Sequence, residues 1–153
     1  MVSPDEGGID NVQKVAKKLN MEWTYIAKSR KSNGLSFDQN SLAAVNRKTI
    51  FILDDIVDTA KTASGASKIL LARGAKKVFA GFSHGIFSSG TLGLLKNSGI
   101  EKAWVSNSVI HDKEQINNNY VKTININKII IEQVLKVAGT LEVDQLEDYG
   151  KRV

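Results

Sequence analysis

Several features that would define a class of protein are missing from this sequence. It contains no cysteine, which excludes disulfide bonds and thiolate metal sites. No apolar run approaches the roughly 20 residues that a membrane-spanning helix needs, and the opening MVSPDEGGID does not resemble a signal peptide. The absence of a Gly-x-x-x-x-Gly-Lys-Ser/Thr motif disfavours a P-loop kinase. Together these absences favour a cytoplasmic protein with no membrane partner.

The net charge of +5 does not by itself identify a ligand. Basic proteins bind nucleic acids or small polyanions. Here the lysines are spread along the chain, and the only pairs of adjacent lysines are Lys17-Lys18 and Lys76-Lys77. No aromatic residues alternate with a basic stripe, as they do in many single-strand binders. We therefore expect a small anionic ligand and no nucleic acid.

Short apolar β-type runs alternate with amphipathic helical stretches along the 153 residues. The predicted strands cover residues 23–27, 48–55, 76–84, 102–110 and 122–126, and the predicted helices cover 9–19, 63–73, 90–96 and 129–135. This alternation predicts an α/β domain in which helices cover both faces of a parallel sheet. The domain is expected to span residues 1–138, followed by a tail at 139–153 for which partial disorder is the expectation. The polar stretch 29–41 is interpreted as a mobile loop.

In such folds, ligands bind beyond the carboxyl ends of the strands. The residues to examine are therefore Asp5, Lys28 and Asp54, each of which follows or ends an extended segment.

Residues 51–62, FILDDIVDTAKT, are the most informative segment. A strand is expected to end at Asp54 and Asp55, and a turn then enters a helix. The N–H groups at a helix start bind anions, and the hydroxyls of Thr59 and Thr62 add donors. Carboxylates beside such a site suit the hydroxyl groups of a sugar phosphate or a divalent cation. The residues alone leave an alternative open, in which an aspartate merely caps the helix.

Two other segments carry candidate residues. The Gly7-Gly8 turn at a helix start can expose amides to a diphosphate, and Asp5 can hold Mg²⁺. A plain loop-to-helix junction is the alternative. Lys28 and Arg30 occupy alternate positions of an extended segment and so share one side, although solvated surface cations fit the same pattern.

These segments resemble those of ribose-phosphate diphosphokinases, which share the type I phosphoribosyltransferase fold. FILDDIVDTAKT is similar to the sugar-phosphate motif of that family, with Ala60 and Lys61 in place of two glycines. SPDEGG is similar to the segment that opens the C-terminal half, YIAKSRKSNG to the flexible catalytic loop, and FAGFSHGIFSSG to a Thr-His-Gly-x-Phe-Ser segment. If position 60 needs a left-handed backbone, alanine there costs roughly 1 kcal/mol.

The resemblance implies a Rossmann-like, three-layer phosphoribosyltransferase domain that forms the C-terminal half of such an enzyme. The implied reaction transfers diphosphate from ATP to ribose 5-phosphate, giving phosphoribosyl diphosphate and AMP. The implied residues are Lys28 and Arg30 for catalysis, Gly7 and Gly8 for the nucleotide phosphates, Asp5 for Mg²⁺, and Asp54, Asp55, Asp58, Thr59, Ala60, Lys61 and Thr62 for ribose 5-phosphate.

The implied partner is an N-terminal domain of similar fold, since members of the family are about twice as long as this chain, and self-association into dimers or rings is expected. A fragment and a short homologue both remain open. Two other functions are alternatives: a phosphoribosyltransferase acting on a base, and a non-catalytic regulatory homologue. His84 is interpreted as structural and His111 as a surface residue.

Overall fold

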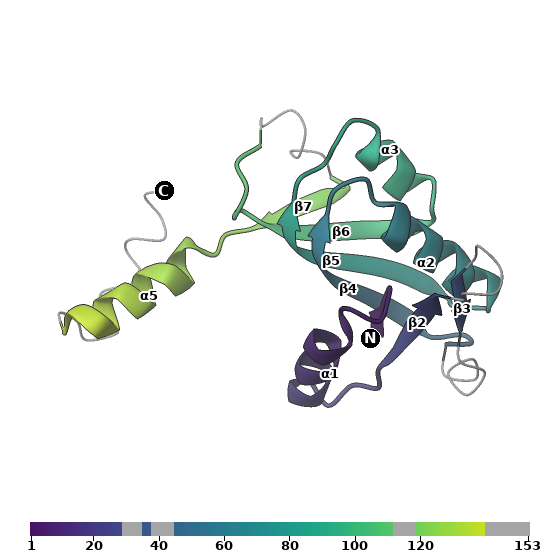
Figure 1. Ribbon diagram of the computed structural model, residues 1–153, viewed down its shortest axis with the longest axis horizontal. Helices are drawn as coiled ribbons and strands as arrows, with labels where there is room; N and C mark the ends of the chain where they lie inside the picture. The colour runs from purple at the N-terminus through teal and green to yellow at the C-terminus, as the bar shows by residue number, and fades with distance from the viewer. Residues whose placement is uncertain (29–34, 38–44, 112–118, 140–153) are drawn as a thin grey trace.

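The computed structural model describes residues 1–28, 35–37, 45–111 and 119–139 (Figure 1). The strands are β1 (Val2–Ser3), β2 (Thr24–Lys28), β3 (Leu35–Phe37), β4 (Thr49–Val57), β5 (Lys77–Gly85), β6 (Ile100–Ser106) and β7 (Val121–Ile124). The helices are α1 (Ile9–Lys18), α2 (Lys61–Ala72), α3 (Thr91–Lys96) and α5 (Asn127–Ala138). The predicted alternation of strands and helices is confirmed.

The strands form one seven-stranded sheet in the order β3-β2-β1-β4-β5-β6-β7. Every pairing is parallel except that of β2 with β3. Strands β2 and β3 lie on one side of β1, and strands β4 to β7 lie on its other side. The order therefore reverses between β1 and β4, and the crevice beyond their carboxyl ends is where such folds bind ligands.

The main core lies between one face of the sheet and helices α2 and α3. Alternate residues of the central strands, such as Ile52 and Ala80, are buried together with Ala66 and Leu70 of α2. The buried residues of α1, Val12 and Ala16, do not belong to this cluster, although α1 packs on β1 and β4. Helix α1 therefore covers the opposite face, which gives the three predicted layers.

Several predicted boundaries are wrong. The stretch 29–41, interpreted as a loop, contains β3, which pairs with β2 from Ile26↔Phe37 to Lys28↔Leu35. An antiparallel edge strand needs only backbone partners, so a polar sequence can form it. Strand β4 does not stop at the two aspartates but continues to Val57, because its pairing with β5 extends to Gly85.

The end of β6 was also predicted too late. The strand ends at Ser106, which pairs with Ile124 at the end of β7, and Ile110 is 96% exposed. Just after β6, the N–H of Asn107 donates to the carbonyl of Ile124 (3.0 Å), and the side-chain oxygen of Asn107 accepts a hydrogen bond from the N–H of Ile126 (2.9 Å). No described helix is long and apolar enough to cross a bilayer. Helix α5 stands apart from the sheet (Figure 1) and has no buried residue. Of the predicted tail at 139–153, Gly139 caps α5, and the residues from 140 onward lie outside the described residues.

The close packing of β5 against the segment that follows it yields a stability prediction. A methyl group on Gly85 would lie 2.5 Å from a ring atom of Phe87 and 2.7 Å from Val105, whereas one on Gly93 of α3 meets nothing within 4 Å. We expect Gly85→Ala to lower the free energy of unfolding by about 2 kcal/mol through overpacking.

Gly93→Ala is the matched control, and we expect it to raise the free energy of unfolding by up to about 1 kcal/mol because alanine is the better helix former. Urea titrations followed by circular dichroism measure both variants. Equal stabilities of the two variants would contradict the packing at Gly85.

Candidate functional site

A cavity of about 170 Å³ opens where β4 turns into α2, next to the switch point of the sheet. Its walls come from the end of β4, the turn, the first turn of α2 and one residue of β5. The lining residues are Asp54, Ile56, Val57, Asp58, Thr59, Ala60, Lys61, Thr62, Ala63 and Phe82. Of the seven residues predicted to bind a sugar phosphate, only Asp55 is not part of this lining.

The start of α2 faces this cavity without a capping group of its own. The residue before the helix, Ala60, makes no side-chain cap, and the first turn contains no acidic residue. The first helical hydrogen bond runs from the N–H of Ser64 to the carbonyl of Ala60 (2.9 Å). The N–H groups of residues 61–63 therefore precede the helical ladder. These free N–H donors and the positive end of the helix dipole favour the binding of an anion at the start of α2.

Ala60 shapes the turn that aims the helix at the cavity. Its backbone is left-handed, with φ of 59° and ψ of 11°, and the side chain is buried, with 6% of its surface exposed. The condition stated for position 60 is thus met: alanine occupies a conformation that glycine adopts freely. The methyl group forms part of the cavity wall without filling the cavity.

Asp58 braces the turn. Its side-chain oxygen accepts hydrogen bonds from the hydroxyl and the N–H (3.3 Å) of Ser88, and its carbonyl accepts one from the hydroxyl of Thr91. These bonds tie the β4–α2 turn to the β5–α3 segment. Ser88 and Thr91 were not among the predicted site residues. The FSSG sequence after β5 resembles part of a family segment, but no local pattern indicates that it contacts Asp58, which lies 30 positions earlier than Ser88.

The two histidines lie near this segment. His84, in β5, bonds through Nδ1 to the hydroxyl of Ser108 (2.7 Å), in agreement with its structural interpretation. His111 was interpreted as a surface residue, and this was wrong: it is half-buried, with its ring packed edge-on against Phe87 at 5.4 Å. Phe87 itself is buried in a left-handed conformation, with φ of 52°.

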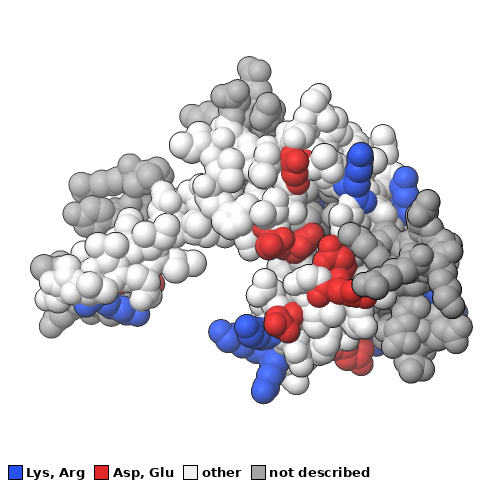
Figure 2. All heavy atoms as spheres, in the orientation of Figure 1, with Lys and Arg blue, Asp and Glu red and all other residues white. Residues whose placement is uncertain are grey.

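Acidic side chains gather around the switch point, and Figure 2 shows them near the middle of this face. The pKa of Asp54 is raised to about 6, mainly by burial and in smaller part by the neighbouring charges of Asp5 and Asp55. The hydrogen bond that its carboxylate accepts from the N–H of Asp55 (3.0 Å) acts in the opposite direction. The site therefore holds negative charge at a position where solvent compensates for it poorly. A bound hydroxyl donor or a cation would favour the ionised form.

The loop after β1 brings Asp5 next to this acid. The N–H of Gly7 donates to Oδ1 of Asp5 (2.9 Å), so that amide is already used within the loop. A methyl group on Gly8 would lie 2.5 Å from Oγ of Ser3 and 3.9 Å from the carboxylate of Asp54. Gly8 is thus needed for close packing between β1, α1 and β4. Contact of either glycine with nucleotide phosphates remains a prediction.

The donor set is compatible with Mg²⁺. No group of three His, Cys, Asp or Glu side chains within the described ranges forms a cage for a metal. Mg²⁺ usually takes one or two carboxylates together with waters and substrate phosphates, and the repulsion among Asp5, Asp54 and Asp55 is what such a cation would relieve. Lys28 ends β2 at the same edge of the sheet, but its side chain and the whole of Arg30 lie outside the described residues.

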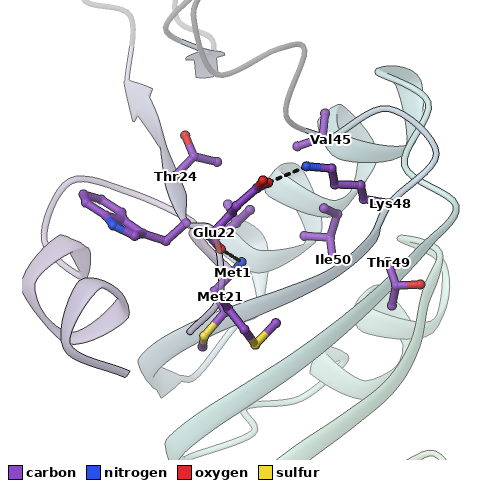
Figure 3. Close-up of a pocket in the computed structure, with 10 residues that line it drawn as sticks. Met1, Met21, Glu22, Thr24, Val45, Lys48, Thr49 and Ile50 are labelled. Carbon is purple, nitrogen blue, oxygen red and sulfur yellow. Dashed lines mark hydrogen bonds and ion pairs between the residues drawn. The ribbon is translucent and has the colours of Figure 1, made fainter. Parts of the chain in front are cut away.

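A second hollow, of about 210 Å³, lies at the opposite end of the sheet (Figure 3). It is lined by the starts of β1, β2 and β4, and the ion pair between Lys48 and Glu22 borders it. Ligands of parallel α/β sheets bind at the carboxyl ends of the strands. This hollow at the amino ends is therefore not the candidate site.

Comparison with known proteins places this arrangement in a family. The model of the phosphoribosyl synthetase-associated domain matches residues 38–146. The chain belongs to this family.

The relatives of this chain include ribose-phosphate pyrophosphokinases. The protein from Thermotoga maritima is 29% identical over 146 residues, which cover 95% of this chain and 45% of the relative. The protein from Halalkalibacterium halodurans is 30% identical over 148 residues, with 97% and 46% covered. A crystal structure of phosphoribosylpyrophosphate synthetase from Mycobacterium smegmatis superposes with a TM-score of 0.78 at 27% identity, covering 92% of this chain and 45% of that one. The chain thus spans about half the length of these relatives.

The left-handed Ala60 of this phosphoribosyl synthetase-associated domain generates a stability prediction. We expect Ala60→Gly to raise the free energy of unfolding by about 1 kcal/mol, because relief of the left-handed strain exceeds the loss of one methyl contact. The control is Ala63→Gly in the first turn of α2, which should lower it by about 1 kcal/mol. Denaturant titration measures both, and destabilisation by Ala60→Gly would contradict the strained turn.

The raised pKa of Asp54 generates a second prediction. Between its ordinary value of 3.8 and about 6, the folded chain binds more protons at this residue than the unfolded chain does. Stability contributed by Asp54 is therefore lost as the pH rises through that window. Solvent screens this partly exposed group, which reduces the effect. We expect Asp54→Asn to be more stable than the wild type by about 1 kcal/mol at pH 7.5. This difference in stability should vanish near pH 4.

Thermal unfolding at several pH values measures this difference. The control is Asp10→Asn, the same change of charge at an exposed position in the first turn of α1. That variant should be slightly less stable than the wild type, since an acid at a helix start is favourable. A pH-independent difference for Asp54→Asn would contradict the raised pKa.

Proposed function

We propose that this chain is the sugar-phosphate half of a ribose-phosphate diphosphokinase, which binds ribose 5-phosphate and, with a second domain, transfers diphosphate from ATP to it. The observation that carries the proposal is the uncapped start of α2, which opens into a cavity that Asp54 also lines. An anion site and a hydroxyl acceptor within one cavity match the two ends of a sugar phosphate.

The 5-phosphate would sit on the N–H groups of residues 61–63. The helix dipole and the exposed ammonium of Lys61 would add positive charge, and the hydroxyls of Thr59 and Thr62 would add donors. Lys61 replaces a glycine of the family motif, and its exposed side chain leaves the cavity open. The bracing of Asp58 by Ser88 and Thr91 would keep these donors in place before the ligand arrives.

The ribose hydroxyls would donate to Asp54 and Asp55. Such bonds favour the ionised carboxylates and would lower the pKa of Asp54 from about 6. The partly buried carboxylate of Asp54, which destabilises the free chain, would thus accept hydrogen bonds from the ligand. This supports a polyhydroxyl ligand over inorganic phosphate alone, which carries no diol.

In the proposed reaction, the 1-hydroxyl oxygen of the ribose attacks the β-phosphorus of ATP. The bond from that phosphorus to the oxygen shared with the α-phosphate breaks, AMP leaves with that oxygen, and the proton of the 1-hydroxyl is released to solvent. Lys28 and Arg30 are proposed to stabilise negative charge on the transferring group. Asp5 is proposed to hold Mg²⁺ together with phosphate oxygens, which would neutralise charge on the nucleotide. The Gly7-Gly8 loop is proposed to face the same phosphates.

The nucleotide base would need residues beyond this chain. The similar pyrophosphokinases are about twice as long, and 45% of the Thermotoga maritima protein corresponds to this chain. We propose that the adenine is held by an N-terminal-type domain or by a second subunit, in an oligomer acting in the cytoplasm.

A second candidate is a sugar-phosphate-binding domain without transfer activity. The strained alanine at position 60 favours this second candidate. The family motif has glycine there, and the replacement of glycine by alanine in a left-handed turn costs stability. Release of AMP from ATP and ribose 5-phosphate in the presence of Mg²⁺ separates the two candidates. The assay is carried out after addition of the remaining part of a similar pyrophosphokinase. Formation of AMP would support the transfer function. Binding of ribose 5-phosphate without formation of AMP would support the second candidate.

The site is tested by reversing one charge at the start of α2. We expect Lys61→Glu to weaken binding of ribose 5-phosphate at least about tenfold, since the new carboxylate occupies the anion site. The melting temperature should stay the same or rise slightly, because an acid in the first turn stabilises a helix. Calorimetric titration measures the affinity.

Lys68→Glu is the matched control, with the same change of charge at an exposed position further along α2. It should bind ribose 5-phosphate as the wild type does. Equal weakening by both variants would indicate a general charge effect, and no binding by the wild type at millimolar ligand would overturn the proposed site.

A further inference from the structure

Phe87 has an unusual backbone conformation for its residue type. It lies just after β5 with φ of 52°, in the left-handed region that bulky side chains rarely adopt. The residue is also buried, with 8% of its surface exposed. A residue is held in such a conformation by its surroundings, and this kind of strain is concentrated at functional sites. The phenyl ring takes no part in the proposed reaction, so the strain points to a role for the backbone.

The left-handed turn at Phe87 directs successive N–H groups toward the end of β4. In an extended strand, successive N–H groups point to opposite sides. Here the N–H groups of Ile86 (2.7 Å) and Phe87 (3.4 Å) both donate to the carbonyl of Val57. The N–H of Ser88 (3.3 Å) and its hydroxyl then donate to Oδ1 of Asp58. Turns that gather N–H groups in this way form concave sites for an anion, and the carboxylate of Asp58 occupies this one.

Two contacts hold the ring of Phe87. A methyl group on Gly85 would lie 2.5 Å from a ring atom, so the ring rests directly on the backbone of that glycine. The ring of His111 packs edge-on against it, with 5.4 Å between the ring centres. Nε2 of His111 is buried and has no hydrogen-bond partner among the described residues. Burial of a polar atom without a partner is unfavourable, so the contact with Phe87 is kept at a cost to stability.

A continuous series of contacts therefore leads from the segment after β6 to the anion site. His111 holds the ring of Phe87, the turn at Phe87 presents Ser88, and Ser88 holds the carboxylate of Asp58. Asp58 lies two residues before Ala60, the left-handed residue at the start of α2. The turn after β4 and the segment after β5 lie side by side, as Figure 1 shows. A shift of the Phe87 ring would thus be passed to the N–H groups that face the cavity.

We propose that Phe87 and His111 are positioning residues of the sugar-phosphate site: they hold Ser88 against Asp58 and thereby set the affinity for the 5-phosphate. This role rests on the proposed function, since it concerns the same anion site. Neither side chain belongs to the described lining of the cavity, so both act through Ser88 and not on the ligand. A residue with a merely structural role would change the melting temperature and leave the affinity of the folded chain unchanged.

The first contact is tested with two substitutions of His111. We expect His111→Ala to weaken binding of ribose 5-phosphate about fivefold, because the unsupported ring of Phe87 lets Ser88 move away from Asp58. His111→Phe keeps a ring edge against Phe87 and should bind within about twofold of the wild type. Calorimetric titration, well below the melting temperature of each variant, measures the affinities. Equal weakening by the two substitutions would contradict the role of the edge-on contact.

Val78→Ala is the matched control for loss of stability. Val78 is fully buried near the start of β5, at the end of the strand away from the site, and its truncation leaves a cavity in the core. This variant should melt at a lower temperature and bind ribose 5-phosphate as the wild type does. Weakening as large as that of His111→Ala would overturn the positioning role, because loss of stability alone would explain both.

The wild type separates this role from the proposed function. Binding by the wild type with the same affinity as His111→Ala would overturn the positioning role and leave the proposed function intact. Absence of binding by the wild type would overturn both. If His111→Ala unfolds the chain, His111→Leu takes its place, since leucine fills the space without providing an aromatic ring.

The second contact is tested at Ser88, which is exposed. Ser88→Ala removes the hydroxyl donor to Asp58 and should weaken binding of ribose 5-phosphate about fivefold, whereas Ser88→Thr keeps the donor and the affinity. Because His111 acts through Ser88, the double variant with both alanines should bind at most about twofold more weakly than the weaker single variant. Full multiplication of the two effects would overturn the proposal, since it would show that the two residues act independently.

Discussion

The site depends on one left-handed turn between β4 and α2. Because Ala60 turns the backbone with φ of 59°, α2 begins without a side-chain cap and aims its first N–H groups at the cavity beside Asp54. A conventional N-cap residue would have satisfied one of these donors with its own oxygen. The turn is held from outside by Ser88 and Thr91, which bond to Asp58. The strain at Ala60 is thus balanced by contacts from another loop, which hold the first N–H groups of α2 toward the cavity.

The same corner carries an electrostatic cost. Asp54 is half-buried near two other carboxylates, and its pKa is raised to about 6. A fold selected for stability alone would place a neutral residue there. Functional sites commonly retain such groups because activity needs a charge that the protein does not neutralise by itself. The strained turn and the desolvated acid therefore point to the same place, although the two observations are independent of each other.

Strand β4 contributes to the core and to the site through different parts of its length. Side chains alternate between the two faces of a strand, so Ile52 of β4 enters the main core while its neighbours Phe51 and Leu53 turn to the opposite face. The site uses the carboxyl end of β4, where Asp54 and the residues that follow line the cavity.

The sequence by itself determined the α/β class, the order of the helices and of the strands other than β3, and the segment 54–62 as the place to look, because hydrophobic periodicity and helix-start chemistry are local properties. It also raised the question of a left-handed backbone at position 60. Tertiary structure alone decided that Ala60 is left-handed, that Asp58 is braced by Ser88 and Thr91, that β4 runs on to Val57, and that His111 packs on Phe87. Each of these depends on contacts between residues distant in the chain, whose register and packing no local pattern records.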